Sequence, residues 1–220
     1  MMRNYFRYLI FLIVSIGFSS SYAGAYEDFL ASIKQDDGAT AATLISRGFD
    51  PNTRDGAGAP ALYLAMREPA FKVAQVLMAA PGIKVDARTP QDESPLMMAA
   101  LKGHTEWVKR LIAAGADVNK TGWTPLHYAA THGHLDPIRL LLDAHAYIDA
   151  ESPNQTTPLM MAAHYGTRAA VQLLLDEGAD PTIKNALDLT AIDFAQRANR
   201  QDVAELIAAA VRKRQPAGRW

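Results

Sequence analysis

A four-residue phrase recurs along the chain at steps of 34, 30, 33 and 33 residues, and this spacing constrains the fold more than any other sequence feature. Its copies begin at Pro60, Ser94, Thr124, Thr157 and Thr190. A second phrase has steps of 34, 33, 30 and 33 residues, and its copies begin at Gly48, Gly82, Gly115, His145 and Gly178. Because two independent phrases share one period, the sequence predicts a stack of similar units with one continuous core.

Each repeat carries the signals of two helices joined by turns. In the repeat around Thr124, a threonine that caps a helix start precedes a proline that fits the first helical turn. A short alanine-rich helix is expected over Leu126–Thr131. Gly133 and Gly166 suit left-handed turns that end such helices. A second helix follows, with apolar residues at helical spacing over 138–142. Neither helix buries its apolar face alone, so neighbouring repeats must stack.

Two stretches carry a family resemblance. Residues 102–119 (KGHTEWVKRLIAAGADVN) and 122–144 (GWTPLHYAATHGHLDPIRLLLDA) are similar to the ankyrin repeat throughout. The resemblance extends over roughly residues 26–212. It implies an all-α ankyrin-repeat solenoid of helix-turn-helix units with short hairpin-like finger loops. It also implies that the chain binds another protein.

On this resemblance the chain divides into six helical units, a leader and a tail. The expected divisions are a signal peptide at 1–25, an N-terminal capping unit at 26–54, a degenerate repeat at 55–88, ankyrin repeats at 89–118, 119–151 and 152–184, a C-terminal capping repeat at 185–215, and a tail at 216–220. The repeat at 55–88 is degenerate because Glu68 and Pro69 stand where a glycine turn is usual. The last helix is expected over Glu205–Arg214.

One finger departs from the common length. The step from Ser94 to Thr124 is three residues short, and the loss falls between Val118 and Trp123. Both flanking helices keep their length, so we expect the stack to survive with a stubby finger at 119–123. Two interpretations remain open: a notch that shapes a binding site, or loop-length variation without functional consequence.

Residues 1–25 have the pattern of a secretory signal. Arg3 and Arg7 precede an apolar run over 8–18, and small residues fit cleavage after Ala23 or Ala25. The run is shorter than the roughly 20 residues of a spanning helix. An uncleaved N-terminal anchor is the alternative, because no charge falls between residues 8 and 25. We therefore expect a periplasmic or secreted protein with no stable membrane insertion after signal cleavage.

Composition and motifs argue against several kinds of site. The chain has no cysteine, which excludes disulfides and thiolate metal ligands. Its 22 basic and 23 acidic side chains give a net charge of -1, which offers no reason to expect nucleic acid. Metalloprotease, nucleophile-elbow and phosphate-loop motifs are absent. We expect no enzymatic activity, no cofactor and no metal.

The histidines have structural explanations in this pattern. The resemblance implies that His127 braces neighbouring repeats through hydrogen bonds. His104 and His134 belong to Gly-His turns and are expected to be structural as well. His132 and His164 fall at similar places in adjacent repeats, but two imidazoles are too few ligands for a convincing metal site.

The expected binding surface is the concave side, where the resemblance places the fingers and the ends of the first helices. The predicted protein-binding residues are Trp123, Tyr165, His132, His164, Leu101 and Lys102. Aromatic anchors among polar neighbours are typical of protein interfaces, although some of these rings could instead pack between fingers and helices. Trp107 lies beside apolar residues of a second helix and is expected to be packed between repeats.

The predicted function is that of a monomeric, non-enzymatic adaptor or regulator that binds another protein outside the cytoplasm. The alternative is a secreted effector that binds a protein of a foreign or host cell. The sequence does not identify the partner, because proteins on one scaffold differ in what they bind.

Overall fold

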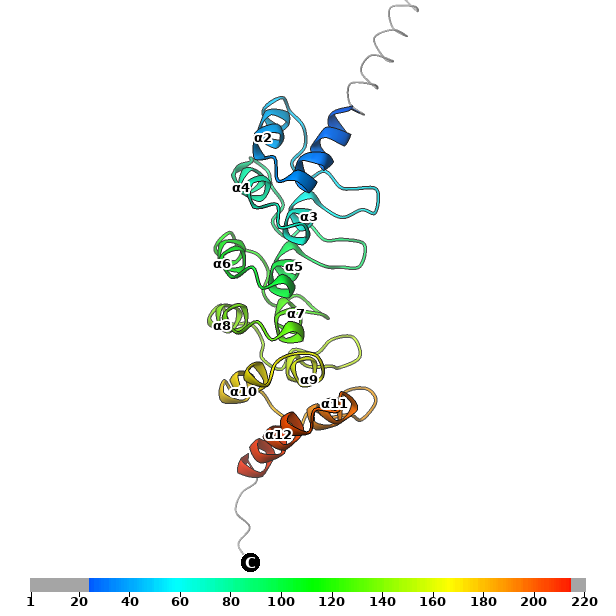
Figure 1. Ribbon diagram of the computed structural model, residues 1–220, viewed down its shortest axis with the longest axis vertical. Helices are drawn as coiled ribbons and strands as arrows, with labels where there is room; N and C mark the ends of the chain where they lie inside the picture. Colours follow the sequence, from blue (N-terminus) through cyan, green and yellow to red (C-terminus); the bar gives the residue numbers. More distant parts are fainter. Residues whose placement is uncertain (1–23, 215–220) are drawn as a thin grey trace, which may run out of the picture. The chain divides into compact units, whose positions relative to one another are not determined.

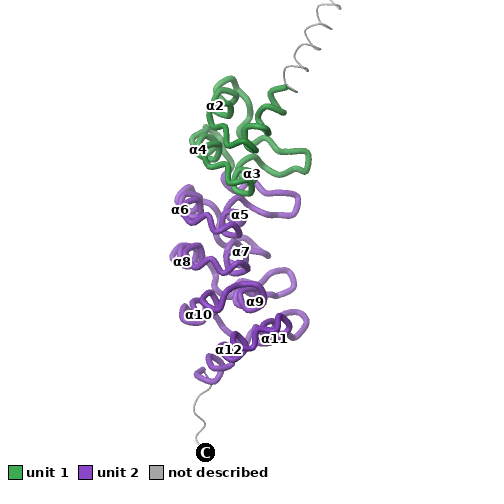
Figure 2. The backbone as a smooth tube through the Cα atoms, in the orientation of Figure 1, with its two compact units in different colours: residues 1–84 green, residues 85–220 purple. Residues whose placement is uncertain are grey.

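The structure is a computed structural model and describes residues 24–214. These residues form two compact units, with the boundary between Lys84 and Val85, as Figure 2 shows. We refer to them as unit 1 and unit 2. Most of the predicted signal peptide at 1–25 and all of the predicted tail at 216–220 lie outside the described residues. Residues 24 and 25 already belong to the first helix.

Unit 1 contains two pairs of helices. The first pair is a helix described over 24–35 and α2 (Gly38–Ser46), and the second is α3 (Ala61–Arg67) and α4 (Phe71–Ala79). Phe29 and Phe49 pack with ring centroids 4.8 Å apart. One Asp36 carboxylate oxygen accepts hydrogen bonds from the backbone N–H groups of Lys72 and Val73 at 2.7 and 3.1 Å. A residue of the first pair thus satisfies two free N–H groups at the start of α4.

Unit 2 contains four pairs of helices that form two rows. The inner helices are α5 (Pro95–Lys102), α7 (Pro125–His132), α9 (Pro158–His164) and α11 (Ala191–Arg197). The outer helices are α6 (Thr105–Ala113), α8 (Leu135–Asp143), α10 (Arg168–Asp176) and α12 (Gln201–Arg214). Each inner helix contacts the outer helix that follows it, and each row is continuous from one repeat to the next (Figure 1). The predicted all-α repeat architecture is confirmed.

The core of unit 2 follows the repeat. Leu96, Leu126 and Leu159 occupy the same place in successive inner helices and are fully buried. Ile138 and Val171 do the same in the outer row. The apolar positions that predicted the second helices are therefore the positions that bury them, and the hydrophobic effect favours stacking over separation.

Trp107 is 5% exposed, as its apolar surroundings predicted. The last helix differs from the expectation, because α12 begins at Gln201 rather than Glu205. Val203 and Ala204 are buried, and their packing extends the helix toward its start.

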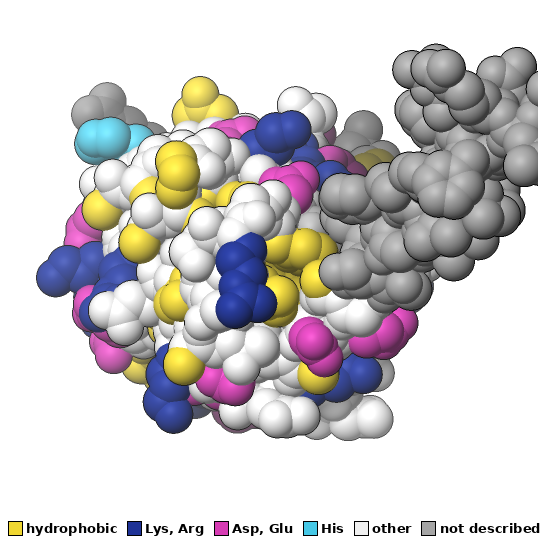
Figure 3. Space-filling model, turned by 90° about the horizontal axis from the view of Figure 1, so that it is seen from above, with side chains coloured by type: hydrophobic (Ala, Val, Ile, Leu, Met, Phe, Trp, Pro, Cys, Tyr) yellow, Lys and Arg dark blue, Asp and Glu magenta, His cyan; other side chains and the backbone are white. Residues whose placement is uncertain are grey.

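The finger loops join an outer helix to the next inner helix without forming regular strands. Within residues 24–214 the ladder-type pairing consists of an isolated antiparallel bridge between Arg54 and Pro60. No helix of this described part has both the length and the apolar character to cross a membrane. On the face that Figure 3 shows, basic and acidic side chains are interspersed rather than gathered by sign.

One side chain per repeat ties each finger to the next. Asn119 Nδ2 donates to the His145 carbonyl at 2.8 Å, and Asn119 Oδ1 accepts from the Tyr147 N–H at 2.7 Å. An aspartate stands at the equivalent positions 86 and 149, where it only accepts, from the N–H groups of the residues at 117 and 180. Burial raises the pKa of the Asp86 and Asp149 carboxyls.

Candidate functional site

The inner helices of unit 2 begin directly after threonine or serine residues that cap them. Ser94 Oγ accepts from the Met97 N–H at 3.2 Å, and Thr157 Oγ1 accepts from the Met160 N–H at 3.4 Å. In α11 the cap is reciprocal, because the Thr190 N–H donates to an Asp193 carboxylate oxygen at 2.7 Å. These caps confirm the predicted helix starts and place the same face of each inner helix in register.

His127 braces two repeats, as the resemblance implied. Its Nδ1 accepts from the Thr124 N–H at 3.2 Å, so the proton lies on Nε2, which donates to the Thr156 carbonyl at 2.8 Å. The ring is fully buried, and this burial lowers the pKa of His127 to about 4. His127 is therefore a neutral structural residue at physiological pH.

The inner helices end in close turns. Gly133 adopts a left-handed conformation with φ of 68°, as predicted. Gly166 was predicted to do the same, but this prediction is wrong, because Tyr165, the residue after α9, has φ of -112° and Gly166 has no positive φ. Glycine is required there for space: a Cβ would lie 2.3 Å from the Ala130 carbonyl oxygen of the preceding repeat.

Leu101, Lys102 and His132 lie at the C-terminal ends of α5 and α7. Leu101 is half-buried, and its carbonyl contacts His134 Nε2 at 3.0 Å. This contact confirms the structural role predicted for His134. Lys102 and His132 are exposed. Burial, together with the nearby His134 and Lys102, lowers the pKa of His132.

His164 and Tyr165 lie at the corresponding end of α9. His164 Nδ1 contacts the Phe194 carbonyl of the next repeat at 3.0 Å, so this histidine is half-buried and engaged in packing. The Tyr165 ring stands edge-on to His164 with centroids 4.1 Å apart and is 62% exposed. Of the six predicted binding residues, Lys102, His132 and Tyr165 are the exposed ones on the inner helix ends.

Trp123 lies just before the N-terminal end of α7, whereas the other predicted residues lie at the C-terminal ends of inner helices. It precedes the cap Thr124, whereas His132 is the last residue of α7, so an eight-residue helix about 12 Å long separates them. The Trp123 ring is half-buried and stands edge-on to His127, with centroids 5.2 Å apart. The structure therefore does not bring Trp123 together with the other predicted residues, although all of them remain on the inner row.

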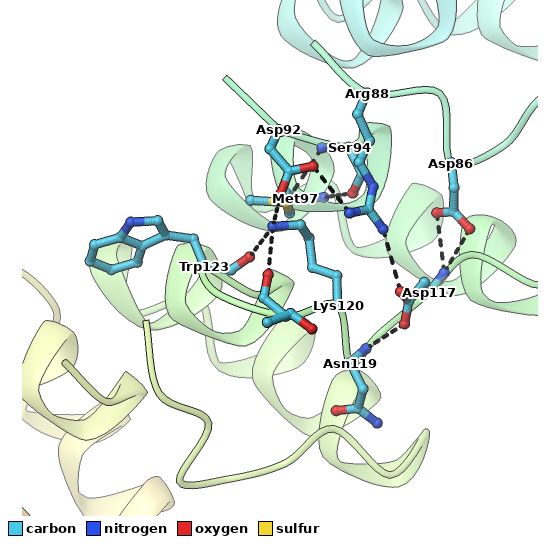
Figure 4. Close-up of polar contacts among 10 residues, drawn as sticks. Asp86, Arg88, Asp92, Ser94, Met97, Asp117, Asn119, Lys120 and Trp123 are labelled. Carbon is cyan, nitrogen blue, oxygen red and sulfur yellow. Dashed lines mark hydrogen bonds and ion pairs between the residues drawn. The ribbon is translucent and has the colours of Figure 1, made fainter. Parts of the chain in front are cut away.

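The shortened finger is held by a buried lysine. Lys120 is 4% exposed at its side chain, and Nζ donates to the carbonyls of Thr121 and Trp123 at 3.0 and 3.1 Å. It also forms an ion pair with Asp92 of the preceding finger at 2.6 Å, as Figure 4 shows. The Lys120 ammonium thus makes the bonds that hold together a finger three residues shorter than its neighbours.

The ion pair continues into a small network. Arg88 Nη1 contacts Asp92 Oδ1 at 3.1 Å, and Arg88 Nη2 contacts Asp117 at 3.4 Å (Figure 4). Hydrogen bonds from Lys120 first, and then from Arg88, hold the pKa of Asp92 below its ordinary value. Asp92 therefore stays ionised at neutral pH and compensates the buried ammonium.

Several surface residues of this region are not among the six predicted binding residues. Tyr128, Met161 and Phe194 occupy the same position in α7, α9 and α11, and all three are half-buried. Their common position in the repeat could have revealed them. Tyr147 and Leu187, which are 68% and 71% exposed, lie in the loops after α8 and α10.

The histidine and acidic side chains of the described residues do not gather into a metal-type site. Among residues 24–214 there is no cluster of three or more histidine or acidic side chains with metal-binding geometry. His132 and His164 belong to no such group in this part of the chain. A shallow depression exists in unit 1 around Gln35, Lys72 and Val76. Its acidic neighbours Asp36 and Asp37 already cap α4 and α2.

Comparison with known proteins supports the repeat reading. Residues 62–154 match the family described as ankyrin repeats (3 copies), and residues 147–195 match the one described as ankyrin repeats (many copies). Together the two matches extend over more than half of the chain.

Similar proteins occur in distant organisms. The ankyrin repeat protein YahD of Escherichia coli (strain K12) is 28% identical over 193 residues, which is 83% of this chain and 95% of that protein. The ankyrin repeat and KH domain-containing protein mask-1 of Caenorhabditis elegans is 35% identical over 126 residues, 55% of this chain. Neurogenic locus notch homolog protein 1 of Xenopus tropicalis is 33% identical over 122 residues, 54% of this chain. The chain spans only 5% of each of these last two proteins.

Proposed function

Since the chain belongs to the ankyrin-repeat family, whose repeats have a protein–protein interaction role, we propose that it is a non-enzymatic adaptor or regulator that binds another protein through the inner helices of unit 2. The observation that carries this proposal is the exposure of Tyr165. A tyrosine ring that is 62% exposed stands at the end of an inner helix, in the row of helix ends that also carries exposed Lys102 and His132. Exposed aromatic rings among polar neighbours are typical anchors of interfaces.

The half-buried side chains of the inner row extend this surface. Tyr128, Met161 and Phe194 present part of their apolar area along three successive inner helices. Tyr128 is fixed in place, because its hydroxyl donates to Glu93 Oε1 at 2.7 Å. A preformed row of this kind loses little conformational entropy on binding, which favours affinity.

We also propose that the protein acts outside the cytoplasm. The proposal rests on residues 1–25, whose two arginines, apolar run and small residues form a secretory pattern. Its test is fractionation of the producing cell together with sequencing of the mature N-terminus. A start at Tyr26 or Gly24 in an extracytoplasmic fraction is expected. Recovery of an intact N-terminus in the cytoplasm would contradict the proposal, and recovery in the medium would favour a secreted effector.

Affinity capture tests the binding surface. The purified chain is used as bait in extracytoplasmic extract, beside a Tyr165→Ala variant and a Tyr147→Ala variant. Tyr147 is the matched control, because it is equally exposed but lies after an outer helix. We expect a protein that is retained by the parent and by Tyr147→Ala and is lost with Tyr165→Ala. Equal retention by all three baits would contradict a site on the inner row.

A further inference from the structure

The inner helices of unit 2 carry charge of essentially one sign. Within α5, α7, α9 and α11 the only acidic residue is Asp193. Its carboxylate accepts from the N–H and hydroxyl of Thr190, so it is engaged in the cap of α11. Each outer helix, by contrast, carries at least one acidic residue.

Every inner helix of unit 2 ends in a basic residue. The last residues are Lys102, His132, His164 and Arg197. A cation at a helix C-terminus is favoured by the helix dipole, which explains one such residue in isolation. Because successive inner helices contact each other, the four ends form a single line, which we call the basic row.

The two permanent cations of the basic row, Lys102 and Arg197, are exposed and form no direct ion pair among residues 85–214, although Arg197 lies near Asp193. Hydrogen bonds from Thr190 and, to a smaller extent, the charge of Arg197 lower the pKa of Asp193. Elsewhere in unit 2, cations such as Arg110 and Lys184 pair with acids four residues away in the sequence. Within the basic row itself, the charge of Lys102 contributes to lowering the pKa of His132, so neighbouring members of the row are electrostatically coupled.

We propose that the basic row recognises an acidic segment of the partner protein. Carboxylates of this segment pair with Lys102 and Arg197, and its apolar side chains contact Tyr165 and the half-buried ring of Phe194. This inference rests on the proposed function and assigns the chemical class of the partner. Charge complementarity carries it, because the two ends of the row are exposed cations without a direct ion pair and the row is edged with aromatic rings.

The spacing of the row sets a minimum length for the segment. Packed helices lie roughly 8–10 Å apart, so the three steps from α5 to α11 amount to about 27 Å. An extended chain rises about 3.3 Å per residue. A segment must therefore contain about nine residues to pair with both Lys102 and Arg197.

Binding of defined peptides to the purified full chain tests this proposal. Fluorescence anisotropy is measured with labelled oligoglutamates of about six and about twelve residues at low ionic strength and neutral pH. We expect the longer peptide to bind about tenfold more tightly than the shorter one, because only the longer one reaches both ends of the row. Added salt weakens exposed ion pairs and should reduce the affinity.

Two double variants supply the matched comparison. Lys102→Gln with Arg197→Gln removes two charges from the basic row, whereas Lys109→Gln with Arg139→Gln removes two exposed charges from the outer helices. We expect the first variant to bind the longer peptide about tenfold more weakly and the second to stay within about twofold of the parent. Circular dichroism confirms that both variants fold.

Several outcomes would overturn the inference. These are equal weakening by the two variants, absence of saturable peptide binding, or tighter binding of a single-stranded DNA of matched charge. If the oligoglutamates do not bind while the Tyr165-dependent partner is still captured, the proposed function stands and the acidic class of the partner is wrong. If no protein is captured and the peptides do not bind, both proposals fail.

Discussion

The repeats at 119–151 and 152–184 have inner helices with the same pattern of burial, but their fingers are held by different interactions. The finger at 152–156 closes on itself, because Ser152 N–H donates to the Thr156 carbonyl at 3.0 Å and Ser152 Oγ accepts from the Thr156 N–H at 3.0 Å. The finger at 119–123 has no equivalent backbone turn and relies on Lys120.

The difference extends to the inner helices. At the third helical position, α7 has His127, which reaches the Thr156 carbonyl of the next finger. In α9 the equivalent Met160 only receives the N–H of its own cap Thr157, at 3.4 Å. The comparison shows that neighbouring repeats of one stack can be held by different kinds of interaction. The finger at 152–156 is closed by backbone and neutral groups. The repeat at 119–151 depends instead on a buried ammonium in its finger and a buried imidazole in its inner helix, and it is therefore sensitive to pH and charge.

The largest expected effect is the pH dependence caused by His127. Burial depresses the pKa of the folded protein to about 4, from an ordinary value of 6.5. Between pH 6.5 and pH 4 the His127 side chain is therefore protonated in the unfolded chain but largely neutral in the folded chain. The free energy of unfolding falls by about 3 kcal/mol in total as the pH drops through this range.

His127→Met introduces the residue that stands at the equivalent position of the next repeat, Met160. Urea unfolding at several pH values should show a flatter stability profile for the variant than for the parent within that window. Parallel profiles for the two proteins would show that His127 does not control the acid sensitivity.

Lys120→Met should have the next largest effect. The substitution keeps the apolar stem but removes the ammonium that bonds two carbonyls and Asp92. We expect the free energy of unfolding to fall by about 2 kcal/mol, because charge-assisted bonds are lost while Asp92 remains hydrated. Lys184→Met in a full-length finger is the control, since its exposed ion pair with Asp188 contributes little. Similar losses for the two variants would mean that Lys120 is an ordinary surface lysine.

Ser152→Ala tests the finger at 152–156, which is closed by backbone and neutral groups. Ser152 is 4% exposed, and its hydroxyl oxygen receives the Thr156 N–H. Loss of one buried hydrogen bond should lower the stability by about 1 kcal/mol, because the backbone bonds of the turn remain. The urea midpoint measures this loss of stability. A loss as large as that of Lys120→Met would contradict the proposed difference between the fingers at 119–123 and 152–156.

Asp86→Asn should give the smallest effect, and it is a gain. Burial, with a smaller contribution from the neighbouring Asp117 carboxylate, raises the pKa of Asp86, so the ionised form is disfavoured in the folded state. An asparagine should remove that penalty and raise the free energy of unfolding at neutral pH by less than about 0.5 kcal/mol, because solvent screens this partly exposed group. The gain should disappear below pH 3.8, where Asp86 is protonated in both states. An unchanged melting temperature at neutral pH would contradict this reading.

The sequence predicted the helices of the stack because its signals are local. A Thr-Pro pair caps a helix start within four residues, and the apolar spacing of an outer helix shows which face is buried. The three-residue deletion was visible for the same reason. The role of Lys120 was not, because its ion-pair partner Asp92 lies 28 residues earlier and in another finger.

The two local errors have the same origin. Gly166 was assigned a left-handed turn from its place after a helix, but its requirement comes from Ala130 in the preceding repeat. The start of α12 was placed too late because the packing of Val203 is a tertiary contact. For the candidate site, the sequence identified the exposed Lys102, His132 and Tyr165, but it did not separate them from Trp123, which packs on His127.

Site-specific photo-crosslinking tests the central claim most directly. A photoreactive phenylalanine analogue is placed at Tyr165 on the inner row or at Arg139 on the outer row, and each protein is irradiated in extract from the producing cell. The account predicts one discrete cross-linked protein from position 165 and none from position 139. Cross-links from position 139 alone, or the same products from both positions, would contradict binding through the inner helices.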